Sequence, residues 1–209
     1  MYNQVKTLKD VFVLKSILSI DTCQEIVEVF NTATHPSRLN LMDDDNQADV
    51  NYTSKRSPGL QYKYLSKDLF NDDAIKTALA IETGLDFVNT KSINNQCLPV
   101  FKYTNGVEIK AHRDTNKDFD INLPVDYVAV AMLSNPRTDF QDGRLYLNFK
   151  AEASKNGKGV IRDHDFDRIY PEFEQGDIVI FNNARCIHAV EPVKGKYSVR
   201  YTCGWRFNH

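Results

Sequence analysis

The sequence predicts a mainly β domain of sandwich or jelly-roll type with helices flanking it on the N-terminal side. Helix signals fall in residues 1–90, whereas residues 97–207 alternate short apolar runs with turn pairs such as Asn105-Gly106. Short strands separated by regular turns are typical of sandwiches and jelly rolls. Because the 209 residues contain no repeat and no low-complexity linker, we expect a single domain over residues 1–209.

Two helices are expected in the first part of the chain. The first follows Ser19, whose hydroxyl can accept from the free N–H groups of a first turn, and its apolar stripe ends at Phe30. The second is expected over residues 72–83, with Gly84 as its C-terminal cap. The polar stretch 37–67 between them is interpreted either as a loop that covers a substrate or as an ordinary surface loop. Residues 1–96 would thus supply helical support and substrate loops.

Six strands are expected in the second half, which would form the β core over residues 97–207. The run Tyr127–Leu133 is apolar on both faces, as an inner strand would be. The last strand alternates strictly, with apolar side chains at odd positions and mostly polar ones at even positions. The expected strands are Leu98–Tyr103, Glu108–His112, Tyr127–Leu133, Arg144–Phe149, Asp177–Phe181 and Tyr197–Phe207.

Composition argues against several classes of protein. The net charge is −2 and the pI is near 6.2, so a nucleic-acid partner, which would require clustered Lys and Arg, is not expected. No apolar run is long enough to cross a bilayer, and the N-terminus lacks the features of a secretory signal. The four cysteines form no CxxC pair, which fits reduced thiols in the cytoplasm.

The segment His112-Arg113-Asp114 is the first candidate for chemistry. In a strand, residues i and i+2 project from the same face, so His112 and Asp114 can converge on one metal ion. A second histidine has to come from elsewhere, and His188 follows the strand Asp177–Phe181 through what is expected to be a short turn. Two histidines and one carboxylate leave open coordination positions, an arrangement that suits ferrous iron.

Three segments resemble the core of the prolyl-hydroxylase-like 2-oxoglutarate oxygenases. They are FKYTNGVEIKAHRDT (101–115), YVAVAMLSNPRTDFQDGRLYL (127–147) and GDIVIFNNARCIHAVEPVKGKYSVRYTCGWRF (176–207). The motifs appear in the family's order: a Tyr and a Gly before HxD, a glycine turn, a GD strand, the distal His, a Pro-Val pair and a Trp. The opening FVLKSILSIDTCQEIVEVF also resembles the first strand and helix of that family.

This resemblance implies a double-stranded β-helix, a distorted jelly roll, with Fe(II) held by His112, Asp114 and His188. It implies a dioxygenase that consumes 2-oxoglutarate and O2, releases succinate and CO2, and hydroxylates a C–H bond, with ascorbate as an expected stimulant. Relatives that halogenate have Gly or Ala at the carboxylate position. Because Asp114 stands there, hydroxylation is favoured over halogenation.

The distal carboxylate of 2-oxoglutarate needs a cation, preferably an Arg fork. Arg200 with Thr202 on the even face of the last strand is our choice, and Lys196 is the rival. The basic residue of the family commonly lies nine to eleven positions after the distal His, and these two lie twelve and eight positions after His188. Tyr103 aligns with a family tyrosine that reaches the co-substrate, although it could equally be a wall aromatic.

Three functions are compared. The preferred one is a hydroxylase acting on an amino acid or amino-acid-like small molecule, with a peptidyl, prolyl-type hydroxylase as the alternative. A non-catalytic jelly-roll module that binds a metal would need neither open coordination positions nor a co-substrate cation. A nucleic-acid demethylase is disfavoured by the near-neutral charge.

Overall fold

The computed structural model describes residues 10–32, 52–53, 59–85, 97–114, 125–150 and 164–207. Within these ranges two α-helices, α1 (Ile20–Thr32) and α2 (Asp72–Thr83), accompany twelve short strands, all paired antiparallel. The first six strands are β1 (Val11–Leu14), β2 (Tyr52–Thr53), β3 (Gln61–Ser66), β4 (Cys97–Tyr103), β5 (Ile109–His112) and β6 (Tyr127–Met132). The last six are β7 (Gln141–Asp142), β8 (Leu145–Asn148), β9 (Ile178–Asn182), β10 (Ile187–Val190), β11 (Val193–Lys194) and β12 (Arg200–Phe207).

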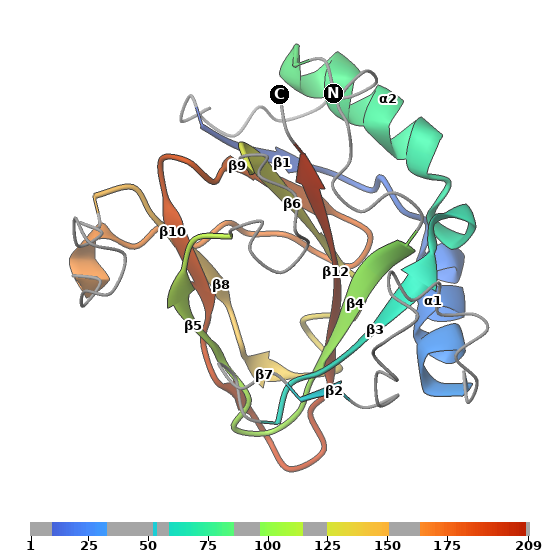
Figure 1. Ribbon diagram of the computed structural model, residues 1–209. Coiled ribbons are helices and arrows are strands. Elements are labelled where there is room, and N and C mark those ends of the chain that lie inside the picture. The colour runs from blue at the N-terminus through green and yellow to red at the C-terminus, as the bar shows by residue number, and fades with distance from the viewer. Residues whose placement is uncertain are drawn as a thin grey trace, which may run out of the picture.

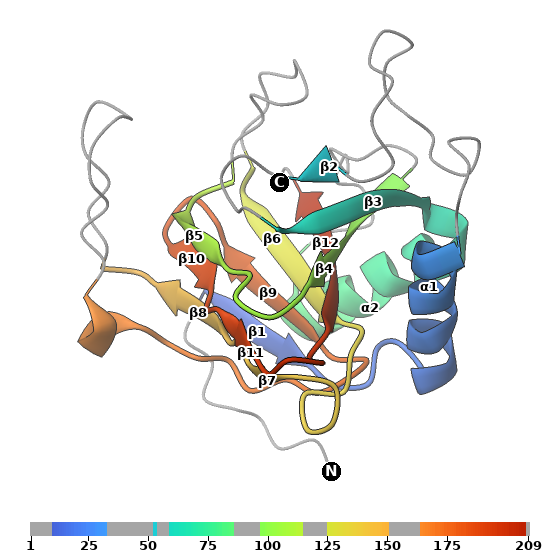
Figure 2. The same ribbon diagram turned by 90° about the horizontal axis from the view of Figure 1, so that it is seen from below.

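The strands form three sheets, and the two larger ones face each other. The major sheet has the order β1-β9-β6-β12-β4-β3-β2, the minor sheet has the order β5-β10-β8, and β7 pairs with β11. Figure 1 shows the minor sheet facing the major one, with the two helices on the outer side of the major sheet. The view in Figure 2 confirms that α1 and α2 lie beyond β12 and β4. This arrangement confirms the predicted mainly β architecture with flanking helices.

One apolar layer joins the helices to the major sheet. Helix α1 begins where Ser19 Oγ accepts from Thr22 N at 3.0 Å, and it buries Ile26 and Phe30 against the sheet. Helix α2 ends at Gly84, whose φ of 71° places it in the left-handed region and whose N–H donates to Ala80 O at 2.9 Å. Both helix predictions are therefore confirmed in position.

The odd residues of β12 belong to this helix-facing layer. The ring of Tyr201 contacts Phe30 with 5.5 Å between ring centroids, and its hydroxyl donates to Asn31 Oδ1. Trp205 is fully buried and donates from Nε1 to Asp72 Oδ1 at 3.0 Å, at the start of α2. Because the odd face is used in this way, the even face must point into the space between the two sheets.

Four details differ from the prediction. Strand β12 begins at Arg200 because Tyr197 lies in a turn and is 84% exposed. His188 lies within strand β10 and not in a turn. Strands β2, β7 and β11 were not predicted, because each is too short to show an alternation of apolar and polar residues. The part of stretch 37–67 that the structure describes includes strand β3 of the major sheet, whereas residues 37–51 and 54–58 lie outside the described ranges.

Strand β3 escaped prediction because its sequence, QYKYLS, mixes polar and apolar residues on both faces. Lys63 faces the helices, with its ammonium group 4.9 Å from the centroid of the Phe30 ring, so its aliphatic stem fills an apolar position.

Within the described ranges, no helix is long and apolar enough to cross a membrane.

Candidate metal centre

Two histidines meet across neighbouring strands of the minor sheet. His112, the last residue of β5, lies directly opposite His188 of β10 in the antiparallel register. Side chains at directly opposed positions project from the same face of a sheet, and the two ring centroids are 4.2 Å apart. The register shifts between His188 and Val190, so an irregularity lies next to the site, as is common beside functional residues.

Asp114 completes the cluster from two residues beyond β5. Its Oδ1 lies 3.3 Å from His112 Nε2 and 3.9 Å from His188 Nε2. One ligand atom from each of the three residues lies within 4.8 Å of the other two. The three side chains singled out from the sequence are thus brought together.

Backbone and ring contacts fix the orientation of the two imidazoles. The Nδ1 atom of His112 lies 2.8 Å from Lys110 O, and a donor at Nδ1 leaves the lone pair on Nε2. His188 is buried, its ring centroid lies 4.8 Å from that of Phe181, and its Nδ1 has no partner among the described residues. In both rings Nε2 is the nitrogen that faces Asp114.

Asn183 holds the backbone that carries Asp114. Its Oδ1 accepts from Asp114 N at 2.9 Å, and its Nδ2 donates to Asp114 O at 3.1 Å and to Val125 O at 2.8 Å. The side chain is 3% exposed, so these bonds are shielded from water. Asn183 therefore fixes the position of the segment that follows β5.

Arg206 of β12 faces the carboxylate from the major sheet. Its Nε donates to Asp114 Oδ2 at 2.8 Å, while the other oxygen, Oδ1, is the one that faces the two imidazoles. Sequence reasoning missed this residue, although it shares the even face of the last strand with Arg200. Strict alternation along the strand places Arg206 on the inner face, but it does not show that the side chain reaches Asp114.

The electrostatics keep Asp114 charged and His188 neutral. Burial alone would raise the pKa of Asp114, but the charge of Arg206 and the hydrogen bond with His112 outweigh it and hold that pKa well below its ordinary value. Burial lowers the pKa of His188 to about 3, and the neighbouring His112 adds to that effect. A neutral imidazole and an ionised carboxylate are the forms that bind metal ions. Two imidazole nitrogens and one carboxylate oxygen match the donor set of non-haem Fe(II) oxygenases.

A buried cation lies deeper between the sheets. Arg200 is fully buried, and none of its three side-chain nitrogens has a hydrogen-bond partner among the described residues. Its guanidinium carbon lies 4.7 Å from the centroid of the Tyr103 ring and 5.9 Å from that of Phe140. Burial lowers the pKa of Arg200. A guanidinium buried without an anion is costly, so this position fits a site for an anionic ligand.

Of the other three residues predicted to contact the co-substrate, two are buried between the sheets and one is exposed. Tyr103 and Thr202 are 2% and 1% exposed and share the inner face with Arg200, which lies opposite Tyr103 in the register. Lys196 lies in the turn before β12, is exposed, and has its ammonium group 5.2 Å from the centroid of the Tyr197 ring. Only the first two therefore accompany Arg200 in the interior.

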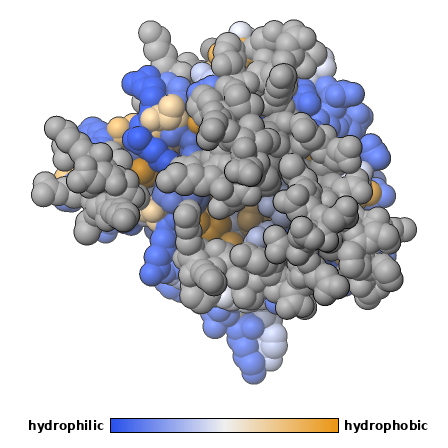
Figure 3. Space-filling view, in the orientation of Figure 1, coloured by the Kyte–Doolittle hydropathy of each residue, from blue (hydrophilic) through white to orange (hydrophobic). Residues whose placement is uncertain are grey.

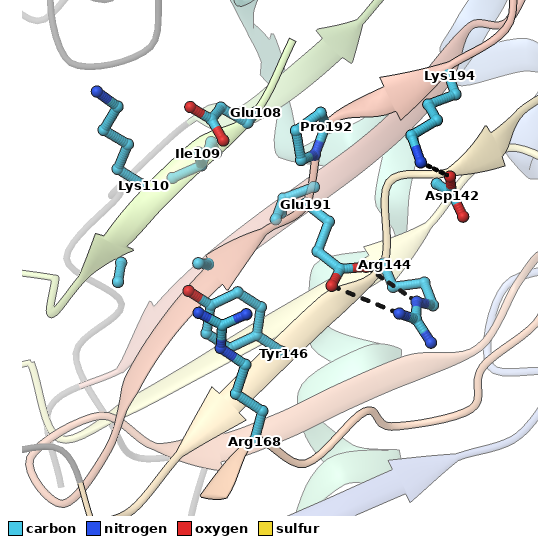
Figure 4. Close-up of a pocket in the computed structure, with 13 residues that line it drawn as sticks. Glu108, Ile109, Lys110, Asp142, Arg144, Tyr146, Arg168, Glu191, Pro192 and Lys194 are labelled. Carbon is cyan, nitrogen blue, oxygen red and sulfur yellow. Dashed lines mark hydrogen bonds and ion pairs between the residues drawn. The ribbon is translucent and has the colours of Figure 1, made fainter. Parts of the chain in front are cut away.

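A separate hollow of about 610 Å³ lies on the outer face of the minor sheet (Figure 4). Four of its charged side chains form two ion pairs, with Arg144 Nε 2.9 Å from Glu191 Oε2 and Lys194 Nζ 2.8 Å from Asp142 Oδ2. None of His112, Asp114 and His188 lines it. The candidate centre is therefore the interior cluster and not this hollow.

Comparisons with known proteins bear on the fold. No protein-family model and no curated protein matches the sequence. A Pseudomonas putida prolyl-4-hydroxylase is 16% identical with a TM-score of 0.60, and the match covers 96% of this chain and 92% of that one. A viral collagen prolyl hydroxylase from Paramecium bursaria Chlorella virus-1, solved as a 2-oxoglutarate complex, is 14% identical with a TM-score of 0.54, covering 98% of each chain.

A third similar structure is the non-haem alpha-ketoglutarate-dependent epimerase SnoN from nogalamycin biosynthesis. It is 12% identical with a TM-score of 0.58, and the match covers 96% of this chain and 79% of that one. All three are 2-oxoglutarate enzymes or prolyl hydroxylases by name, and identities this low establish the architecture alone. The chain therefore has the double-stranded β-helix fold of the prolyl-4-hydroxylase-like 2-oxoglutarate oxygenases.

Proposed function

We propose that this chain is a 2-oxoglutarate- and Fe(II)-dependent dioxygenase that hydroxylates an unactivated C–H bond of an amino acid or amino-acid-like small molecule. One observation carries the proposal: the His112, Asp114 and His188 cluster shares the space between the sheets with Arg200, which is fully buried and whose guanidinium has no hydrogen-bond partner among the described residues. A metal module without catalysis would have no use for that cation. The 2-oxoglutarate enzymes among the structural neighbours support the same reading.

His112, Asp114 and His188 would hold the iron. When bound, Fe(II) supplies a centre at which O2 is reduced while 2-oxoglutarate is decarboxylated, so that R–H, O2 and 2-oxoglutarate give R–OH, succinate and CO2. The protein's part is placement. The Lys110 carbonyl orients His112, Asn183 fixes the backbone of Asp114, and Arg206 occupies one carboxylate oxygen so that Oδ1 remains for the metal.

Arg200 would bind the distal carboxylate of 2-oxoglutarate, with the hydroxyls of Thr202 and Tyr103 as additional donors. A guanidinium forms paired, charge-assisted bonds with a carboxylate, and burial strengthens them. Lys196 is the weaker candidate because it is exposed and lies outside β12. The aromatic faces of Tyr103 and Phe140 would keep water away from the ion pair.

A peptidyl hydroxylase is the second candidate. A similar structure is a prolyl hydroxylase from Trichoplax adhaerens in complex with a peptide fragment, at 15% identity and a TM-score of 0.53, covering 96% of this chain and 84% of that one.

We also propose that the chain lies in the cytoplasm, because its three described cysteines are free thiols, which fits a reducing compartment.

The test is turnover with a defined panel. The purified chain is loaded with Fe(II) without oxygen, mixed with 2-oxoglutarate, ascorbate and a set of free amino acids and short prolyl peptides, and then exposed to O2. Mass spectrometry should find one product heavier by one oxygen atom, together with an equal amount of succinate. If the chain binds no iron and forms no succinate with any member of the panel, the proposal is wrong.

A further inference from the structure

A bulge in β5 shapes the hollow on the outer face of the minor sheet. In the register with β10, Ile109 lies opposite Val190 and His112 lies opposite His188. The four residues from Ile109 to His112 thus face only three residues of β10, so β5 carries one extra residue. Ile109 packs against the core between the sheets and His112 belongs to the metal cluster, whereas the two residues between them line the hollow. We call this hollow the outer hollow.

The outer hollow has a small, apolar base. Residues 108–111 and 189–192 line it, together with five further residues. Ala111 and Ala189 are the sequence neighbours of the two metal-cluster histidines and project from the opposite face of the same strands. Figure 3 shows apolar surface at the bottom of another hollow, in the space that Figure 1 places between the two sheets. The outer hollow lies behind the histidines and does not share that space.

Two of the seven charged residues that line the outer hollow have no partner among the described residues. The other five are each held in an ion pair, namely Arg144 with Glu191, Lys194 with Asp142, and Arg168 with Asp165 outside the hollow. The side chains of Glu108 and Lys110 form neither an ion pair nor a hydrogen bond within the described part of the chain. Figure 4 shows both at the β5 side of the hollow, across from the two ion pairs.

Glu108 and Lys110 together match a ligand that carries both charges. Glu108 is partly exposed and Lys110 is exposed, so a ligand in solution can reach both. They are two positions apart along an extended strand, so their backbones are separated by roughly 7 Å. An α-amino acid carries its ammonium and carboxylate groups on one carbon atom. It can therefore donate to Glu108 and accept from Lys110 at the same time, with a charge-assisted hydrogen bond at each end.

We infer that the outer hollow is a binding site for a small zwitterion with an apolar side chain, of the type of a free amino acid. The apolar side chain lies on Ala111 and Ala189, because the remaining charged residues are already paired and leave no partner for a charged one. A volume of about 610 Å³ is ordinary for a small-molecule site. This site goes beyond the proposed function, since it requires neither a metal nor Arg200.

The experiment compares three probes that share one apolar group. The full chain, kept metal-free with EDTA, is titrated calorimetrically with L-leucine, with 3-methylbutylamine, which keeps only the ammonium, and with 4-methylpentanoate, which keeps only the carboxylate. We expect L-leucine to bind at least about tenfold more tightly than either analogue, because one charge-assisted hydrogen bond contributes a difference of this size. Equal affinities for the three probes, or no binding of L-leucine, would show that the outer hollow is not a zwitterion site.

Variants locate the binding in the outer hollow. Glu108→Gln and Lys110→Met should each weaken L-leucine binding about tenfold. Combining Glu108→Lys with Lys110→Glu should recover it, because both charges are again present. Glu25→Gln and Lys196→Met, at exposed positions elsewhere, are the matched controls and should bind like the unaltered chain. Arg200→Met should also bind normally. If Arg200→Met abolishes binding while Glu108→Gln and Lys110→Met do not, L-leucine binds between the sheets and the inferred site is wrong.

Discussion

The two faces of β12 arise from the same alternating sequence pattern, but they differ in whether their polar groups have partners. The odd residues Tyr201, Cys203, Trp205 and Phe207 pack under the helices, and their polar atoms find partners there, as Trp205 does with Asp72. On the even face, the guanidinium of Arg200 is fully buried without a hydrogen-bond partner among the described residues. The first face is paired within the chain, whereas under our proposal the second face pairs its buried guanidinium with the carboxylate of 2-oxoglutarate. The proposal therefore assigns packing to one side of the strand and ligand binding to the other.

The largest effect is expected where the even face reaches the metal ligands. Asp114→Ala removes the carboxylate that faces both imidazoles, so iron binding should be lost and succinate formation should fall below detection. The fold should persist because Asn183 holds only the backbone of this segment. The measurement is iron content together with circular dichroism. Asp165→Ala, at a residue whose side chain is 84% exposed, is the matched control and should retain full iron content.

Arg200→Met tests whether the inner face of β12 binds 2-oxoglutarate. Losing a buried carboxylate partner costs about 2–5 kcal/mol, so the apparent Kd for 2-oxoglutarate should rise at least about thirtyfold. Thermal unfolding of the ligand-free chain should be unchanged or shifted upward, because an unpaired buried charge is removed. Lys196→Met is the control and should leave the 2-oxoglutarate Kd unaltered. Reversed results for these two variants would transfer the role to Lys196.

Arg206→Met should give a smaller effect that is specific to the metal. Partners that orient a metal ligand typically contribute about 10–100-fold to metal affinity. The variant should therefore bind Co(II), used as a spectroscopic probe, about 10–100-fold more weakly, and Arg206→Lys should recover part of the loss because it keeps the charge. An unchanged Co(II) affinity in Arg206→Met would mean that the 2.8 Å contact with Asp114 has no positioning role.

The smallest effect on chemistry is expected on the helix-facing side. Trp205→Phe removes the bond to Asp72 Oδ1, and the loss of one buried hydrogen bond should lower the free energy of unfolding by about 1–3 kcal/mol. The KM for 2-oxoglutarate should stay the same, because Trp205 points toward the helices and away from the space between the two sheets. Denaturant unfolding and steady-state kinetics on the same preparation check both statements. A raised KM with unchanged stability would remove the distinction between the two faces.

The sequence predicted most of this arrangement because alternation and turn residues are local properties. The helices, the β-rich second half and the pairing of His112 with Asp114 could all be read from short segments. The contacts of Arg206 and Asn183 with Asp114 could not be predicted in this way. They form only when strands that are distant in the sequence fold together. Strand β3 was missed because Lys63 fills an apolar position with its stem.

We propose that one ligand, 2-oxoglutarate, contacts both Arg200 and the metal cluster. The most direct measurement is anaerobic titration of the Fe(II)-loaded chain with 2-oxoglutarate, followed by its visible charge-transfer band, in the unaltered chain and in Arg200→Met. We predict a saturable band in the unaltered chain and a band of the same position but much weaker affinity in the variant. A band with the same affinity in both proteins, or no band in either, would contradict the proposed role of Arg200.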